Sequence, residues 1–298
     1  MGADSYSHSS RSIRAADAGY YTKSREEIFT SHKVPADMAV MGLGVRECFD
    51  SSVHPYSIPI IIALDITGSM GKIPHQLVQD GLPKMISLLH EKGIMDAAVC
   101  FVAVGDHKSD RGILQVGQFE SGDEKLDHWL TSVWLEGNGG GNGGESYFLP
   151  WYFAAKHTHT HAWEKRNQKG FLFTIGDERC HDTISAEQMH SLTGGSYEGT
   201  LTSKEILEQA KEKWNVFHLN LSNSTQRVPG EMREESVQLH WKSILGDDAI
   251  YVKDFHDIPT VIAEKIVSYL VKPSHKVTEE TSIEVKEEKK DDKQDIIL

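Results

Sequence analysis

Residues 58–71 read IPIIIALDITGSMG, and this stretch decides the fold class. Its first seven residues are apolar or proline, a run typical of a strand that is buried on both faces of a parallel sheet. The run ends on Asp65, and two hydroxyl residues, Thr67 and Ser69, follow at alternate positions. Because alternate residues of an extended segment point the same way, we expect the three side chains to face one point beyond the strand.

Strand-like and helix-like segments alternate along the rest of the chain. Further apolar runs typical of strands occupy residues 96–106, 112–121, 170–178, 215–222 and 249–254. Apolar residues at helical spacing occupy residues 73–93, 123–137, 146–159, 202–214 and 258–271. This alternation predicts an α/β protein with a doubly wound, mainly parallel sheet and helices on both faces.

Composition divides the chain into three parts. Residues 1–54 form a polar N-terminal extension that we expect to be partly disordered, with the first twenty or so residues loose. Residues 55–272 carry the α/β pattern. Residues 273–298 are expected to be a disordered tail, because 13 of the last 25 residues are charged and none is aromatic.

Charge and cysteine content narrow the class of protein. The 298 residues carry a formal charge of −13, which argues against a general nucleic-acid binder. The three cysteines have no metal-binding spacing and indicate reduced thiols in the cytoplasm. The N-terminal residues lack a secretory signal, and no apolar run approaches the ~20 residues that span a bilayer. We therefore expect a cytoplasmic protein with no nucleic-acid or membrane partner.

The polar residues at two strand ends predict a metal site. Asp65 and Asp177 both follow apolar runs, and the carboxyl ends of parallel strands meet at one edge of a sheet, where ligands bind. A carboxylate and the hydroxyls of Thr67 and Ser69 are the oxygen ligands that Mg²⁺ prefers, with Mn²⁺ as the alternative ion. The sequence therefore predicts a site for a hard divalent cation at this edge.

The string DITGSMG, residues 65–71, resembles the first motif of the von Willebrand factor A (vWA) family. That family has a Rossmann-like doubly wound sheet and a metal-ion-dependent adhesion site, the MIDAS. The resemblance covers roughly residues 55–272 and implies that Asp65, Thr67 and Ser69 hold the ion. It also implies that a partner protein presenting Asp or Glu completes the metal shell. Intracellular members act as adaptors in larger assemblies, often with an ATPase or a kinase.

The second motif of the family is a loop that supplies a threonine ligand. The corresponding loop here, residues 139–146, reads GGGNGGES and contains no threonine. Asn142, Glu145 or Ser146 would have to replace it. The loop is similar to the GGGDxPE loop of vWA domains in some alpha-kinase-associated proteins, and that likeness favours Asn142 and Glu145.

The third motif is an aspartate at the end of the fourth strand. The string FTIGDERCHD supplies Asp177, with Glu178 beside it. The family more often has aspartate before glycine, whereas here Gly176 precedes Asp177, so either acid could face the metal. In the family this residue tends to reach the ion through water.

Two other interpretations remain open. The chain also resembles haloacid-dehalogenase phosphohydrolases, in which Asp65 would be the nucleophile and Asp177 and Asp182 would form the last acidic motif. Thr67 stands where that family has its general acid, and a helix follows at once instead of a hairpin or cap, so an enzyme is not the favoured interpretation. The other alternative is a scaffold with a degenerate metal site.

Five further residues attract attention as possible ligands. His157, His159 and His161 alternate in KHTHTH, and we expect them in a solvated loop. His181 lies beside Cys180, a pairing that we interpret as a coincidence in a polar loop.

Overall fold

A six-stranded sheet forms the centre of the molecule. The computed structural model describes residues 4–137, 143–221 and 231–271. The strand order is β10-β9-β6-β2-β3-β4, and all neighbours are parallel except β3 and β4. The strands are β2 (Ile58–Asp65), β3 (Ala97–Val104), β4 (Leu114–Val116), β6 (Gly170–Gly176), β9 (Trp214–Leu221) and β10 (Ala249–Val252). The predicted doubly wound, mainly parallel α/β fold is confirmed.

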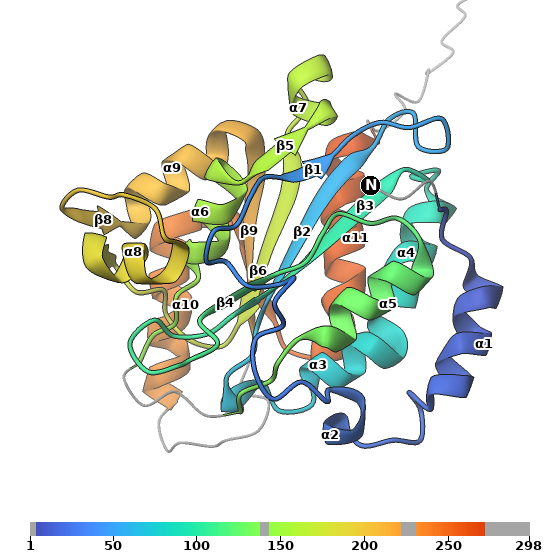
Figure 1. Cartoon of the computed structure of the whole chain (residues 1–298), viewed down its shortest axis with the longest axis horizontal. Coiled ribbons are helices and arrows are strands. Elements are labelled where there is room, and N and C mark those ends of the chain that lie inside the picture. The colour runs from blue at the N-terminus through green and yellow to red at the C-terminus, as the bar shows by residue number, and fades with distance from the viewer. Residues whose placement is uncertain (1–3, 138–142, 222–230, 272–298) are drawn as a thin grey trace, which may run out of the picture.

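Helices cover both faces of this sheet (Figure 1). One face carries α4 (Leu82–Glu91), α5 (Asp123–Ser132) and α11 (Ile258–Leu270). The other carries α6 (Phe148–Lys156), α9 (Ser203–Lys213) and α10 (Glu231–Leu245). Peripheral elements include α1 (His8–Ala18), α2 (Arg25–Ile28), β1 (Arg46–Cys48), β5 (Thr158–Thr160), α7 (His161–Arg166), β7 (Thr183–Ser185), α8 (Ala186–Thr193) and β8 (Thr200–Thr202).

The central strand β2 shows why its sequence is apolar throughout. Ile60 and Ile62 pack into the core under α4 and α11, while Ile61 and Ala63 pack into the core under α6 and α9. A strand with helices on both faces has no polar side, so its hydrophobic run is continuous. Asp65 is the last residue of this strand and reaches the carboxyl edge of the sheet.

The helix that follows the first strand tip contains a π-helical segment. It runs through α3 (Ile73–Gln76), a π segment at Leu77–Gly81 and α4. Pro83 has no N–H to donate to the carbonyl of Gln79 four residues earlier, and proline is a common cause of such irregularities. The carbonyls of Val78 and Gln79 accept hydrogen bonds from the guanidinium of Arg11 instead.

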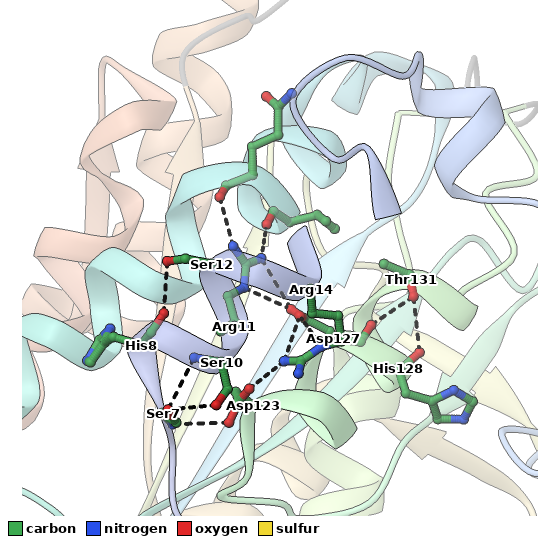
Figure 2. Close-up of polar contacts among 12 residues, drawn as sticks. Ser7, His8, Ser10, Arg11, Ser12, Arg14, Asp123, Asp127, His128 and Thr131 are labelled. Carbon is green, nitrogen blue, oxygen red and sulfur yellow. Dashed lines mark hydrogen bonds and ion pairs between the residues drawn. The ribbon is translucent and has the colours of Figure 1, made fainter. Parts of the chain in front are cut away.

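Arg11 belongs to the N-terminal helix α1, which packs against α5 (Figure 2). Its guanidinium is 2% exposed and pairs with Asp127 at 3.2 Å. Arg14 of the same helix pairs with Asp123 at 2.5 Å. The expectation that the first twenty residues are loose is therefore wrong for His8–Ala18. A polar helix can be ordered in this way when its charges are paired and its arginine satisfies backbone carbonyls.

The N-terminal extension also contacts the loop after the first strand tip. Ser24 begins α2 with a capping box that includes Glu27. Arg25 then donates a hydrogen bond of 2.8 Å from Nη1 to the carbonyl of Gly71. The N-terminal extension therefore contacts the segment after β2 at two places. Arg25 binds at Gly71, and Arg11 binds at the π segment.

Other expectations have mixed outcomes. Residues 112–121 are predicted to form one strand, but β4 spans only Leu114–Val116, because residues 117–119 belong to no strand and the chain pairs with β3 again at a bridge between Glu120 and Val99. The tail at 273–298 lies outside the described residues. The three cysteines are buried free thiols. Within the described part, no helix combines the length and apolarity needed to cross a membrane.

Candidate metal centre

The first strand tip is organised around the buried carboxylate of Asp65. Its Oδ1 accepts hydrogen bonds from the backbone N–H of Thr67 at 2.8 Å and from the Thr67 hydroxyl at 2.7 Å. This local turn follows from the D-x-T spacing, since a short acidic side chain readily bonds to the backbone two residues on. Asp65 and Thr67 are both buried.

Ser69 connects the first tip to the second. It lies in the short 3₁₀ turn Gly68–Met70, with its Oγ 3.2 Å from the Thr67 Oγ1. The same Oγ donates a hydrogen bond of 2.9 Å to Oδ1 of Asp177, the residue directly after β6. The structure thus brings together Asp65, Thr67, Ser69 and Asp177, four of the six residues that the sequence singled out.

The hydroxyl oxygens of Thr67 and Ser69 have the spacing of two neighbouring metal ligands. The Thr67 hydroxyl donates to Asp65 and the Ser69 hydroxyl donates to Asp177. The two hydroxyl oxygens lie 3.2 Å apart, and either hydroxyl could donate to the other. Adjacent oxygen ligands around an octahedral Mg²⁺ with 2.1 Å bonds lie about 3.0 Å apart. The spacing of the hydroxyls therefore fits two neighbouring ligands of such an ion.

Tyr147 fixes the other oxygen of Asp65, and the sequence analysis missed it. Its hydroxyl donates a 2.6 Å hydrogen bond to Asp65 Oδ2. Burial raises the pKa of Tyr147 well above its usual value, so the hydroxyl remains a donor. A Cβ added at Gly176 would lie only 1.9 Å from the tyrosine Oη. The Gly-Asp order of this motif is thus explained, because a larger residue before Asp177 would displace Tyr147.

Among the three residues proposed to replace the missing threonine, Glu145 has the appropriate environment. Asn142 lies outside the described residues. The Ser146 Oγ accepts a hydrogen bond of 2.8 Å from the backbone N–H of His107 and so belongs to another cluster. Glu145 is 1% exposed, and its Oε2 has no hydrogen-bond partner.

The Glu145 backbone bridges the loops on either side of it. Its N–H donates to the carbonyl of Arg179 at 2.8 Å, and its carbonyl accepts from the N–H of His181 at 3.0 Å. Burial, and then the charge of Asp65, raises the pKa of Glu145 to about 11. A cation would stabilise a buried acid that has an unpartnered oxygen and lies within reach of another carboxylate's charge.

The pKa of the Asp65 carboxyl is raised as well, again by burial and by a neighbouring carboxylate. Burial and the neighbouring charge of Asp177 raise the pKa of Asp65 to about 7. Asp177 itself is half-buried, as is Ser69, whereas Asp65 and Glu145 are buried. The site is therefore closed on the protein side and reachable from solvent at Ser69 and Asp177. Asp177 is the acid that accepts the hydrogen bond from Ser69.

The alternating histidines do not form a metal site. Thr158–Thr160 form β5 and pair with β1, so the expectation of a loop is wrong at these residues. His159 bonds to Glu164, while His161 stacks on Phe49 with ring centroids 4.2 Å apart. The phenylalanine and the neighbouring strand explain why this segment is extended and ordered.

A second group of potential ligands contains His181. In the described part of the chain, one set of three His, Cys, Asp or Glu side chains has ligand atoms within 4.8 Å of one another, namely Asp106, His107 and His181. All three side chains are buried. The interpretation of His181 as a coincidental loop residue is therefore not supported by its position. No sequence signal links it to Asp106, which lies 75 residues away.

Comparisons with known proteins give structural likeness only. No protein-family model matches the sequence, and no curated protein matches it. The pilus adhesin SpaC from Lactobacillus rhamnosus GG is similar over 76% of this chain and 32% of its own, with 10% identity and a TM-score of 0.48. Proximal thread matrix protein 1 from the mussel byssus, with a zinc-occupied MIDAS motif, is similar over 75% of this chain and 48% of its own, with 9% identity and a TM-score of 0.44. The chain spans less than half of either protein, and at these values the likeness carries no argument about function.

Proposed function

We propose that this chain is a vWA-like, metal-dependent protein-binding module. A divalent cation, Mg²⁺ or Mn²⁺, would be held at the carboxyl edge of the sheet by oxygens of Asp65, Thr67, Ser69, Glu145 and Asp177. The bound ion supplies positive charge and a coordination position that faces solvent. An Asp or Glu of a partner protein would occupy that position.

The observation that carries this proposal is the pair of hydroxyl oxygens 3.2 Å apart, one of them bonded to Asp65 and the other to Asp177. Two oxygens at this separation can be neighbouring ligands of one divalent cation. Oxygen ligands of this kind favour a hard ion over a transition metal. Tyr147 holds Asp65 in place, and Glu145 supplies a buried acid with an unpartnered oxygen.

The solvent-facing side supports a protein ligand instead of a small substrate. Ser69 and Asp177 are half-buried at the edge of the sheet, so a side chain on a second polypeptide can reach them. A carboxylate suits this position, because it can coordinate the ion and neutralise its remaining charge. An adaptor role in a larger assembly, with an ATPase or a kinase as the partner, follows only from the family resemblance.

The geometry favours binding over phosphoryl transfer. A phosphohydrolase needs a general acid near its nucleophile, but the residue at that position is Thr67, whose hydroxyl donates to Asp65 Oδ1. Asp182, which the phosphohydrolase interpretation places at the metal, is exposed and outside the set of hydrogen bonds that joins Asp65 to Asp177. The third interpretation, a scaffold with a degenerate site, would give partner binding that does not depend on metal.

Affinity capture with and without a chelator tests the proposal. The full chain is immobilised and exposed to cell lysate in Mg²⁺ or in EDTA, and captured proteins are quantified by mass spectrometry. We expect a set of partners that EDTA removes and that Asp177→Asn also removes. The matched control is Asp182→Asn, which makes the same change at an exposed carboxylate. Partners that persist in EDTA and on Asp177→Asn would instead support the scaffold interpretation.

A further inference from the structure

We infer that Asp106, His107 and His181 form a second metal site, selective for a transition-metal ion of the Zn²⁺ type. The site is separate in its ligands from the one at the strand tip. It combines one carboxylate oxygen with two imidazole nitrogens, and all three side chains are buried. Nothing in the proposed binding function requires it.

The carboxylate of Asp106 is held in one orientation by its own loop. Its Oδ1 accepts a hydrogen bond of 3.0 Å from the backbone N–H of Lys108, and its Oδ2 accepts one of 2.9 Å from the Ser109 hydroxyl. Asp106 follows β3 by two residues, so the rigid sheet sets its position. A fixed carboxylate needs little reorganisation to become a metal ligand.

His181 is placed beside this carboxylate from the opposite loop. Its Nε2 lies 2.9 Å from Asp106 Oδ1. A Cβ on Gly144 would lie 2.8 Å from the ring, so only a glycine there leaves room for the imidazole. The backbone N–H of His181 is bonded to Glu145, which fixes the start of the side chain. An oxygen and a nitrogen at this separation can bind the same ion with small adjustments.

His107 provides the third ligand. Its Nδ1 lies 3.9 Å from Asp106 Oδ1 and 2.7 Å from the hydroxyl of Ser146. Its ring meets that of His181 edge to face, with centroids 5.2 Å apart.

The donor set decides the class of ion. Mg²⁺ and Ca²⁺ prefer oxygen ligands, whereas imidazole nitrogen suits Zn²⁺ and neighbouring transition metals. Two imidazoles and one carboxylate are also a known three-ligand set for zinc, with the fourth position open to water or another ligand. The two sites on this chain therefore differ in the ion that each prefers.

Lys108 controls access to this second site. Its Nζ lies 3.2 Å from Nδ1 of His181. An ammonium can only donate, so Nδ1 accepts and Nε2 carries the proton that bonds Asp106. When an ion binds Nε2, that proton must leave Nε2, and Nδ1 must become the protonated nitrogen. Lys108 then loses its acceptor and has to swing away, which an exposed lysine can do. Zinc binding therefore competes with the Lys108 contact.

Metal titrations of the untagged full chain test the inference. Zn²⁺ is titrated in a competition assay with a chromophoric chelator, and Co²⁺ is titrated while its visible d–d absorption is recorded. Both are performed in excess Mg²⁺ so that the tip site is saturated. The variants are His181→Gln, His107→Gln and Lys108→Met, and the matched control is His159→Gln, which removes an exposed imidazole elsewhere. Circular dichroism verifies that each variant is folded.

We expect one equivalent of Zn²⁺ or Co²⁺ on the wild type and on the control. Loss of either cluster histidine should weaken binding by at least about tenfold, while Lys108→Met should strengthen it. An unchanged affinity in folded His181→Gln or His107→Gln would overturn the inference. Lys108→Met changes an exposed side chain, so it gives a second test if the histidine variants misfold, and absence of tighter binding there would also overturn it. Asp65→Asn should keep the Zn²⁺ affinity and lose Mg²⁺ binding, which separates this inference from the proposed function.

Discussion

Replacing Glu145 with methionine should make the metal-free protein more stable. The Glu145 side chain is 1% exposed, and its Oε2 has no hydrogen-bond partner. Leaving one buried polar atom unsatisfied costs about 1–3 kcal/mol. Methionine has a similar length and no strongly polar atom, so it removes this cost while filling the same space. The structure therefore predicts a gain of about 1–3 kcal/mol in the free energy of unfolding when metal is absent.

The same substitution should reduce the stabilisation that Mg²⁺ provides. A ligand at 100 times its dissociation constant stabilises the folded state by about 2.7 kcal/mol. Glu145→Met would lose most of this increment, since it removes one ligand of the proposed site. In EDTA the variant should therefore have the higher free energy of unfolding. In Mg²⁺ the wild type should gain more stability than the variant, so the difference should shrink or reverse. A residue with a purely structural role would not produce this dependence on metal.

Thermal unfolding followed by circular dichroism provides the assay. For a domain of this size, about 1–3 kcal/mol corresponds to a rise in Tm of roughly 2–12 °C in EDTA. Glu198→Met is the control, because it makes the same substitution at an exposed glutamate. The reasoning is refuted if Glu145→Met lowers the Tm in EDTA, or if Mg²⁺ raises the Tm of wild type and variant equally.

Three further perturbations test the packing and the electrostatics. Gly176→Ala should destabilise the protein by about 1–3 kcal/mol in urea unfolding, because its Cβ would lie 1.9 Å from the Tyr147 hydroxyl. Adding Tyr147→Phe, which removes that hydroxyl, should restore part of the lost stability. Arg11→Met should cost about 3–5 kcal/mol, because it removes the buried partner of Asp127 and the donor to the carbonyls of Val78 and Gln79, although Arg14 still pairs with Asp127 at 3.3 Å. Arg14→Met, at a side chain 28% exposed, should cost clearly less, and equal losses would contradict the proposed burial effect. His218 is buried, and desolvation lowers its pKa well below the usual value, so the unfolded chain binds the proton first as the pH falls through about 6.5. The free energy of unfolding should therefore decline by about 1 kcal/mol between pH 6.5 and 5.5. His218→Phe should remove that part of the decline, and identical pH profiles of wild type and variant would contradict this assignment.

The sheet and the first strand tip could be predicted because their signals are local. A continuous apolar run identifies β2, and the D-x-T-x-S spacing places three polar side chains within one turn of it. The position of Asp177 beside Ser69 could be anticipated as well, since parallel strands end at the same edge. Whether these residues bind metal is a chemical question that the spacing alone does not answer.

The contacts that the sequence did not reveal depend on pairs of residues far apart in the chain. Arg11 lies in a serine-rich segment with no apolar face, and only the folded arrangement puts it against the π segment before Pro83. The pairing of Tyr147 with Asp65 spans 82 residues. The need for glycine at position 176 is visible only when Tyr147 is seen beside it. Single-sequence patterns report periodicity and turns, but they do not report which distant side chains meet.

Titration calorimetry of Mg²⁺ tests the central claim most directly. The claim is that oxygens from the tips of β2 and β6 converge on one hard divalent cation. We predict that the wild type and the exposed-carboxylate control Asp182→Asn each bind one Mg²⁺, and that Asp177→Asn binds it at least about tenfold more weakly. Absence of Mg²⁺ and Mn²⁺ uptake by the folded wild type, or equal affinity in Asp177→Asn, would contradict the account.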